Sequence, residues 1–151
     1  AQACKDSKSA LFIGRGMGAA VAEEGALKLK EVSYLHAEAY PAGEMKHGPI
    51  ALIEPGFPVI AVATESPTYE KVLSNIQEAK ARGAMVVAVA TEGDERIGGY
   101  ADHVISIPKV RDAFSPITAI IPLQLLARQI ALLRGCNIDQ PRNLAKSVTV
   151  E

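Results

Sequence analysis

The ionisable residues whose types and spacing could support chemistry lie in two short segments of the chain. In the first, residues 23–49, Glu24, Lys28 and Glu31 are separated by four and three residues, so they lie on one face of a helix. The second, residues 139–151, is a polar tail with a single lysine. Carboxylates and lysines can move protons on a carbonyl compound and can hold its carbonyl carbon as an imine.

The residue pattern alone leaves two interpretations open for each of these groups. The charged row on the helix is more typical of solvated ion pairs, worth roughly 0.2–0.5 kcal/mol each, than of a catalytic site. His47 lies in a loop bounded by glycine and proline, where an imidazole suits either proton transfer or a structural contact. The tail is either frayed, as its composition favours, or lies along a groove and delivers Lys146 into a site.

The glycines of residues 14–18, in the sequence GRGMG, follow a predicted strand and precede a predicted helix. That context suits an anion-binding turn, but the spacing matches neither the dinucleotide-binding nor the Walker pattern, and the segment contains no Ser or Thr hydroxyl. We therefore expect a tight strand-to-helix connection and no nucleotide cofactor. A metal site is not expected either, because no other His or Cys stands at ligand spacing from His47.

Composition limits the classes of function. The chain has 151 residues, 48% of them hydrophobic and 22% charged, which fits one domain with a substantial core. A net charge of −1 gives no electrostatic reason to expect nucleic acid or an anionic membrane as partner. Cys4 and Cys136 show no metal-type spacing and are typical of reduced thiols in a cytoplasmic protein. The apolar run of residues 117–133 is interrupted by polar side chains, so it predicts a buried helix rather than a membrane span.

Short, almost uniformly apolar runs alternate with longer helical stretches along the chain, as is typical of parallel strands covered by helices on both faces. The predicted strands are residues 10–14, 36–40, 57–63, 84–90 and 102–108. The predicted helices are residues 18–33, 44–53, 67–82 and 115–134. The result is an α/β domain of three layers with a parallel sheet of about five strands, and ligands would bind beyond the carboxyl ends of the strands.

Several segments closely resemble the second of the two sugar-isomerase (SIS) units in the glutamine–fructose-6-phosphate aminotransferase family. The segments are EGALKLKEVSYLHAEAYPAGEMKHGPIALI, LFIGRG, PLQLLA and DQPRNLAKSVTVE, and the likeness extends over essentially the whole chain. The resemblance implies a flavodoxin-like SIS fold. It also implies that residues 1–138 are the second SIS domain and that residues 139–151 are a C-terminal tail carrying the active-site lysine. Because the chain begins without Met, we expect it to be a piece of a longer protein.

In that family, fructose 6-phosphate reacts with ammonia derived from glutamine, and the product is glucosamine 6-phosphate. The resemblance implies that Glu31 moves a proton between C1 and C2 and that Lys28 assists at the sugar hydroxyls. It further implies that His47 opens the sugar ring in the neighbouring subunit's site and that Lys146 forms the imine with the ketose. Ala145, Lys146 and Glu31 are then substrate-binding residues, and no cofactor is implied.

The residues themselves are compatible with these roles. From one helical face, Glu31 and Lys28 offer a carboxylate for proton transfer and a donor for the developing oxygen anion. A lysine can form an imine only when it is desolvated or near another cation, so the tail would have to bury Lys146 beside the sugar. We expect Glu24 to orient Lys28.

The resemblance also implies partners: a first SIS unit and a glutaminase domain in the same full-length chain, and a second copy in a cytoplasmic homodimer. The Ser/Thr-rich loop that grips the sugar phosphate in the family belongs to the first unit, and no such loop follows Gly14 here. We therefore expect the chain alone to be inactive or nearly so. The alternative is a non-catalytic sugar-phosphate-sensing SIS module, which would not need the four implied catalytic side chains.

Overall fold

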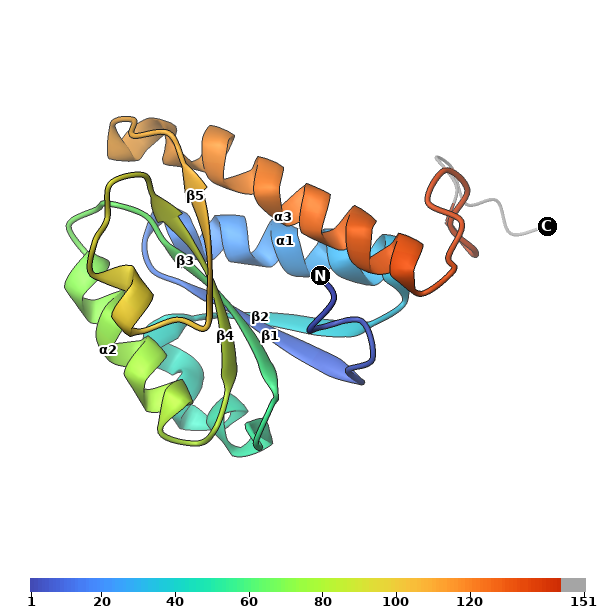
Figure 1. Cartoon of the computed structure of the whole chain (residues 1–151), viewed down its shortest axis with the longest axis horizontal. Helices are drawn as coiled ribbons and strands as arrows, with labels where there is room; N and C mark the ends of the chain where they lie inside the picture. The colour runs from blue at the N-terminus through green and yellow to red at the C-terminus, as the bar shows by residue number, and fades with distance from the viewer. Residues whose placement is uncertain (145–151) are drawn as a thin grey trace.

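In the computed structural model, which describes residues 1–144, five parallel strands form a single sheet (Figure 1). The strands are β1 (Ser9–Gly14), β2 (His36–Pro41), β3 (Pro58–Ala63), β4 (Met85–Thr91) and β5 (His103–Ile107). Their order across the sheet is β2-β1-β3-β4-β5. β2 therefore lies at one edge beside β1, and β3, β4 and β5 follow on the other side of β1. The prediction of an α/β fold with about five parallel strands is confirmed.

Helices cover both faces of the sheet and make it the middle of three layers. They are α1 (Met17–Ser33), α2 (Tyr69–Lys80), α3 (Ser115–Leu133) and the short 3-10 helices η1 (Ala42–His47), η2 (Pro49–Leu52), η3 (Ile97–Gly99) and η4 (Asp112–Phe114). α1 and α3 lie together on one face, whereas α2, η1 and η2 lie on the other (Figure 1). The face on which each candidate residue lies therefore follows from the helix that carries it.

One of the predicted helices is replaced by two shorter ones. Residues 44–53 contribute to η1 and η2 and do not form an α-helix. Gly48 separates the two with a φ of 163°, and Pro49 begins η2. Proline lacks the N–H that a continuing helix needs, and it disfavours helical backbone in the residue before it. The prediction of one helix here was wrong because of this Gly-Pro pair.

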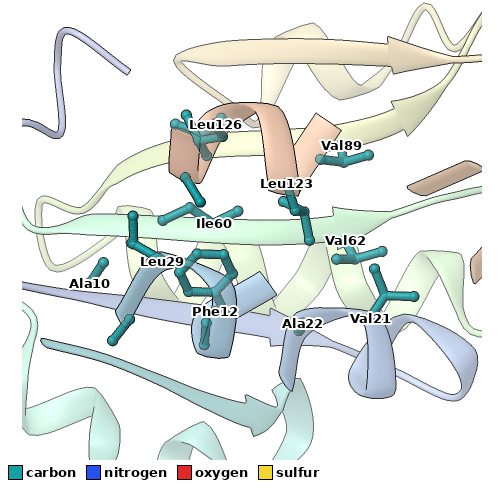
Figure 2. Close-up of a cluster of buried hydrophobic side chains, with 14 of the residues drawn as sticks. Ala10, Phe12, Val21, Ala22, Leu29, Ile60, Val62, Val89, Leu123 and Leu126 are labelled. Atoms are coloured by element: carbon teal, nitrogen blue, oxygen red, sulfur yellow. The ribbon is translucent and has the colours of Figure 1, made fainter. Parts of the chain in front are cut away.

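The packing of α1 against β1 and α3 forms the core of the first face (Figure 2). Phe12 of β1, Leu29 of α1 and Leu123 of α3 are each 1% exposed. Gly25 permits the close approach of α1, because a Cβ there would lie 2.6 Å from Leu123 Cδ1 and 3.1 Å from Phe12 Cε1. The apolar face of α1 is thereby buried, and its polar face stays at the surface.

The opposite face is closed by α2 and η1. Met45 of η1 and Ile76 of α2 are buried in a cluster with Leu11 and Ile13, whose side chains leave β1 on that side. η1 also contacts β1 and β2, so its position is fixed against the sheet. The cover is incomplete at the edge strand β5, where Val104 is 40% exposed.

The glycines between β1 and α1 form a tight connection, as predicted. A Cβ at Gly14 would lie 2.2 Å from the carbonyl oxygen of Gly18, and Gly16 has a φ of 53°, which favours glycine. Arg15 leaves this loop toward α2, where its Nε donates to Asn75 Oδ1 at 2.9 Å. The connection is therefore held by close backbone packing, and its arginine is bound to α2.

α3 is apolar on two sides. Its inner side packs on α1 and the sheet and buries residues such as Ile130. On its outer side, Ile117, Ile121 and Leu125 are 67%, 51% and 59% exposed, and we call these three residues the α3 stripe. By length and composition Asp112–Leu133 could cross a membrane, but the inner side of this segment is part of the core. The prediction of a buried helix therefore holds for one side only.

Candidate functional site

Glu24, Lys28 and Glu31 form a row of ion pairs on α1. Lys28 Nζ donates to Glu31 Oε2 at 2.7 Å and lies 3.4 Å from Glu24 Oε1. The exposed fraction of the side chain is 43% for Glu24, 30% for Lys28 and 22% for Glu31, so the row is neither buried nor fully solvated. The prediction that the three side chains share one face is confirmed, and Glu24 lies where it can orient Lys28.

Lys28 lines a groove of about 280 Å³ at the seam between α1 and α3. The other residues of the groove are Val32, Gln124, Ala127, Arg128, Ile138 and Asp139. The last two belong to the segment that follows α3, so the base of the tail forms one wall. A second groove of about 310 Å³ along the same seam contains Glu24. The charged row thus borders an open seam between two helices.

The charges around Lys28 favour its protonated form. The hydrogen bond to Glu31 raises the pKa of Lys28 above its ordinary value, and the negative charges of Glu31 and Glu24 act in the same direction, against partial desolvation. A protonated amine cannot attack a carbonyl carbon, whereas it can donate a proton or stabilise a developing oxygen anion. Lys28 therefore suits the stabilisation of a developing oxygen anion better than imine formation.

His47 does not join this row within the chain. It lies in η1, on the face of the sheet opposite to α1, with its Nε2 3.8 Å from Glu44 Oε2 and its side chain 63% exposed. Because the sheet separates η1 from α1, the imidazole cannot act together with the charged row of its own unit. Its exposure leaves it accessible to another molecule.

Ala145 and Lys146 lie outside the described residues, so their roles stay predictions. The described part of the tail, residues 139–144, contacts the residue that caps α1, because the amide of Arg142 donates to the Tyr34 hydroxyl at 2.8 Å. As far as this contact, the tail lies along the domain surface, whereas residues 145–151, on which the choice between a frayed tail and one lying in a groove depends, lie outside the described residues. Sequence analysis missed Tyr34, since no spacing or motif singles it out.

A separate pocket of about 310 Å³ lies beyond the carboxyl ends of β3 and β4, where ligands bind in open parallel sheets. Its lining is rich in carboxylates, namely Glu65, Glu70, Glu92 and Asp94. Among residues 1–144, no group of three or more His, Cys, Asp or Glu side chains is arranged to hold a metal ion. The sheet-edge rule therefore locates a pocket, but the predicted site residues lie elsewhere, on α1 and η1.

The chain is similar to several known proteins. A family profile described as "SIS domain" matches residues 4–134. The glutamine–fructose-6-phosphate aminotransferase (isomerizing) of Thermus thermophilus is 64% identical over 141 residues, which are 93% of this chain and 23% of that protein. The enzyme of the same name from Chlorobaculum tepidum is 58% identical over 147 residues, which are 97% of this chain and 24% of that protein. The chain thus spans about a quarter of the length of these curated relatives.

The fold agrees with a solved structure of similar sequence. The C-terminal domain of glucosamine-fructose-6-phosphate aminotransferase from Francisella tularensis matches with a TM-score of 0.87 at 39% identity. The match covers 92% of this chain and 39% of that chain. The agreement confirms the predicted three-layer architecture, and the solved domain contains more chain than this unit alone.

Replacing Lys28 by Met tests whether the charged row contributes to stability. The variant keeps the apolar stem, and we expect the free energy of unfolding at about pH 7 to fall by about 0.5 kcal/mol, as for partly exposed ion pairs. The folded-state pKa of Lys28 is raised above 10.5, so this contribution is complete below pH 10.5 and is lost as the pH rises through the folded value. The difference in the free energy of unfolding between the variant and wild type, measured by urea unfolding, should therefore disappear at high pH.

Lys30→Met is the matched control, because it removes an exposed charge from the same helix. A difference between wild type and Lys28→Met that is equally large at both ends of the pH range would contradict the ion-pair interpretation.

Proposed function

This chain belongs to the SIS domain family, and we propose that it is the C-terminal half of the isomerase domain of a glutamine–fructose-6-phosphate aminotransferase, also called glucosamine-6-phosphate synthase. The observation that carries the proposal is the Lys28–Glu31 pair, held at 2.7 Å beside the groove where the tail begins. Similarity to aminotransferases over nearly the whole chain supports it. The proposed substrate is fructose 6-phosphate, and the product, glucosamine 6-phosphate, would serve hexosamine synthesis in the cytoplasm.

The proposed reaction divides the chemistry between two lysines and one carboxylate. Imine formation between the Lys146 amine and the ketone of the open-chain sugar releases water, and ammonia from glutamine then replaces the lysine amine. Glu31 removes a proton from C1 and returns it to C2, while the C1 hydroxyl loses its proton and the imine nitrogen gains one, which converts the ketose imine into the amino aldose. The Lys28 ammonium, held protonated by Glu31, stabilises the negative charge that develops on the sugar oxygen.

The ion pairs of Lys28 favour the assignment of imine formation to a second lysine. An amine must be neutral to attack a ketone, and the pairs with Glu31 and Glu24 keep Lys28 charged. Lys146 belongs to the segment that continues from the groove wall at Asp139. The tail is therefore the proposed source of the amine for this site.

The proposed site is incomplete in this chain alone. The connection from β1 to α1 is closed by glycine packing and contains no Ser or Thr hydroxyl for a phosphate. We propose that a first SIS unit supplies the residues that bind the phosphate, that a glutaminase domain supplies ammonia, and that both belong to one longer chain.

The α3 stripe is the proposed contact surface for the first unit, because it exposes three large apolar side chains in a row. Without these partners the chain is proposed to be inactive or nearly so.

His47 is proposed to act in the site of a second copy. It lies across the sheet from Lys28 and Glu31, so it has no route to them in its own unit. In a two-fold homodimer, the commonest oligomeric symmetry, each copy could supply His47 to the other. There the imidazole would act as the acid and base that opens the sugar ring.

A non-catalytic sugar-phosphate-sensing module is the alternative function. It is not favoured, because relatives that are 54% to 64% identical are named as aminotransferases. A sensor also has no need to combine Lys28, Glu31, His47 and Lys146 in one chain. Borohydride reduction of the full-length protein in the presence of fructose 6-phosphate distinguishes the two, since only the enzyme would form a stable adduct on Lys146.

Glu31→Gln in the full-length enzyme is expected to lower the rate of interconversion by about 10² to 10⁴, because the amide has nearly the same shape but cannot take a proton. Borohydride trapping of the sugar on Lys146 should continue at the wild-type level, since the amine is unchanged. Glu23→Gln, an exposed change on the same helix, is the matched control. Near-normal turnover in the Glu31 variant would remove this carboxylate from the mechanism.

Mixed dimers test the proposed role of His47. Glu31→Gln and His47→Asn each inactivate both sites of their own homodimer, whereas a dimer with one copy of each has one site with both changes and one site with neither. Random pairing of equal amounts should restore about a quarter of wild-type activity, since half of the dimers are mixed and each has one working site. Activity no higher than that of the separate variants would show that His47 acts within its own chain.

Ile121→Glu tests the α3 stripe as a contact surface. In this chain alone, the free energy of unfolding should change by less than about 0.5 kcal/mol, because Ile121 is exposed. In the full-length protein the charge would enter an apolar interface, and we expect a loss of more than about 2 kcal/mol, measured by chemical unfolding. Gln129→Glu on the same helix is the control. An equally small effect of Ile121→Glu in both proteins would exclude the stripe as an interface.

A further inference from the structure

The helix that carries Lys28 and Glu31 ends at a tyrosine with left-handed backbone. Tyr34 caps α1 with a φ of 59° and a ψ of 16°. Glycine, or less often asparagine, usually takes this position, because a side chain makes left-handed backbone unfavourable. A large aromatic residue there is retained only when other contacts hold it in place.

Two contacts from one distant residue hold Tyr34. The amide N–H of Arg142 donates to the Tyr34 hydroxyl at 2.8 Å, and the guanidinium carbon of Arg142 lies 4.1 Å from the centre of the ring. The second distance is that of a cation–π contact, which a planar guanidinium group makes well. The two residues are 108 positions apart, so the pair joins the end of α1 to the tail.

Further contacts hold the chain that follows α3 against the C-terminal end of α1. Arg134 Nε donates to the carbonyl oxygen of Ser33 at 3.1 Å, at the last turn of α1. Asn137 Oδ1 then accepts the amides of Asp139 and Gln140, each at 3.1 Å, which closes a turn. This turn forms a wall of the groove between α1 and α3. The chain therefore reaches the tyrosine contact along a defined path.

We propose that Tyr34 is a positioning residue, which anchors the tail at Arg142 so that the segment bearing Lys146 starts from a fixed point, three residues after Asp139, which lines the same groove as Lys28. Lys146 follows Arg142 by four residues, and four residues of extended chain span at most about 14 Å. Without the anchor, the last contacts that hold this part of the chain would be those of the Asn137 turn, so more residues would separate Lys146 from the last fixed point and the effective concentration of its amine at the groove would fall. The role of Lys146 rests on the proposed function, whereas the anchor itself does not.

Variants of Tyr34 separate anchoring from simple helix capping. Tyr34→Gly removes both contacts to Arg142 but gives α1 a residue that adopts left-handed backbone without strain. Tyr34→Phe removes only the hydroxyl acceptor and keeps the ring. If the tyrosine served only to end the helix, glycine would replace it without any effect on the tail.

Hydrogen exchange of the Arg142 amide in this chain tests the anchor directly. We expect Tyr34→Phe to accelerate that exchange roughly three- to tenfold, as for the loss of one hydrogen bond. Tyr34→Gly should accelerate it further, while the thermal midpoint of the chain changes little. Tyr100→Phe, which alters a tyrosine beside η3, is the control and should leave the Arg142 amide unchanged. Wild-type exchange at Arg142 in Tyr34→Gly would overturn the anchor.

Borohydride trapping with fructose 6-phosphate in the full-length enzyme tests what the anchor is for. We expect Tyr34→Gly to slow the formation of the Lys146 adduct about tenfold and Tyr34→Phe to slow it less, with glutamine hydrolysis unchanged. A wild-type trapping rate in Tyr34→Gly would overturn the positioning role. If the wild-type enzyme formed no adduct on Lys146, the proposed function would fail, and the exchange result at Arg142 would still decide whether the anchor exists.

Discussion

The approach of α1 to β1 and α3 across Gly25 is the constraint on which the rest of the structure depends. A side chain at that position would meet Leu123 and Phe12, so only glycine allows the helix to pack this closely. Glycine inside a helix costs about 0.5–1 kcal/mol, which is offset by the apolar area that Phe12, Leu29 and Leu123 bury. The packing fixes the rotation of α1 about its own axis. It therefore determines both that Lys28 faces the seam and that the end of the helix meets the tail.

Lys28 and Glu31 lie on a packed helix rather than on loops at the sheet edge, so their positions relative to each other are fixed. The amine of the proposed mechanism, in contrast, belongs to Lys146 in the tail. Helix geometry keeps Lys28 beside Glu31, and this contact raises the pKa of Lys28 and so favours its ammonium form. On the proposed mechanism, the amine that must be neutral when it attacks the ketone is that of Lys146, and the tail carries it. α1 serves both parts, since its polar face carries the charged row and the residue that caps it, Tyr34, accepts a hydrogen bond from the Arg142 amide.

Features that depend on local sequence were predictable, and those that depend on distant contacts were not. β3 and β4 were predicted within one residue at each end, because uniform apolar runs bounded by polar residues have few other interpretations. The prediction of a helix at residues 44–53 was wrong, because the Gly-Pro pair disfavours continuous helical backbone even though the surrounding residues fit a helix. Helical spacing alone placed the charged row on one face. The face on which His47 lies follows from the sheet order, and the left-handed Tyr34 is explained only by Arg142, which no local pattern connects to it.

The α3 stripe has a consequence for how a chain of this kind is made. On the proposed arrangement, the first SIS unit leaves the ribosome before this one, because synthesis runs from the N-terminus and domains fold as they emerge. When α3 appears, its partner surface is then already folded, and the exposed apolar side chains are covered almost at once. Produced apart from that unit, the same helix would present an association-prone surface. The order of the units along the gene would thus itself protect the protein from misassembly.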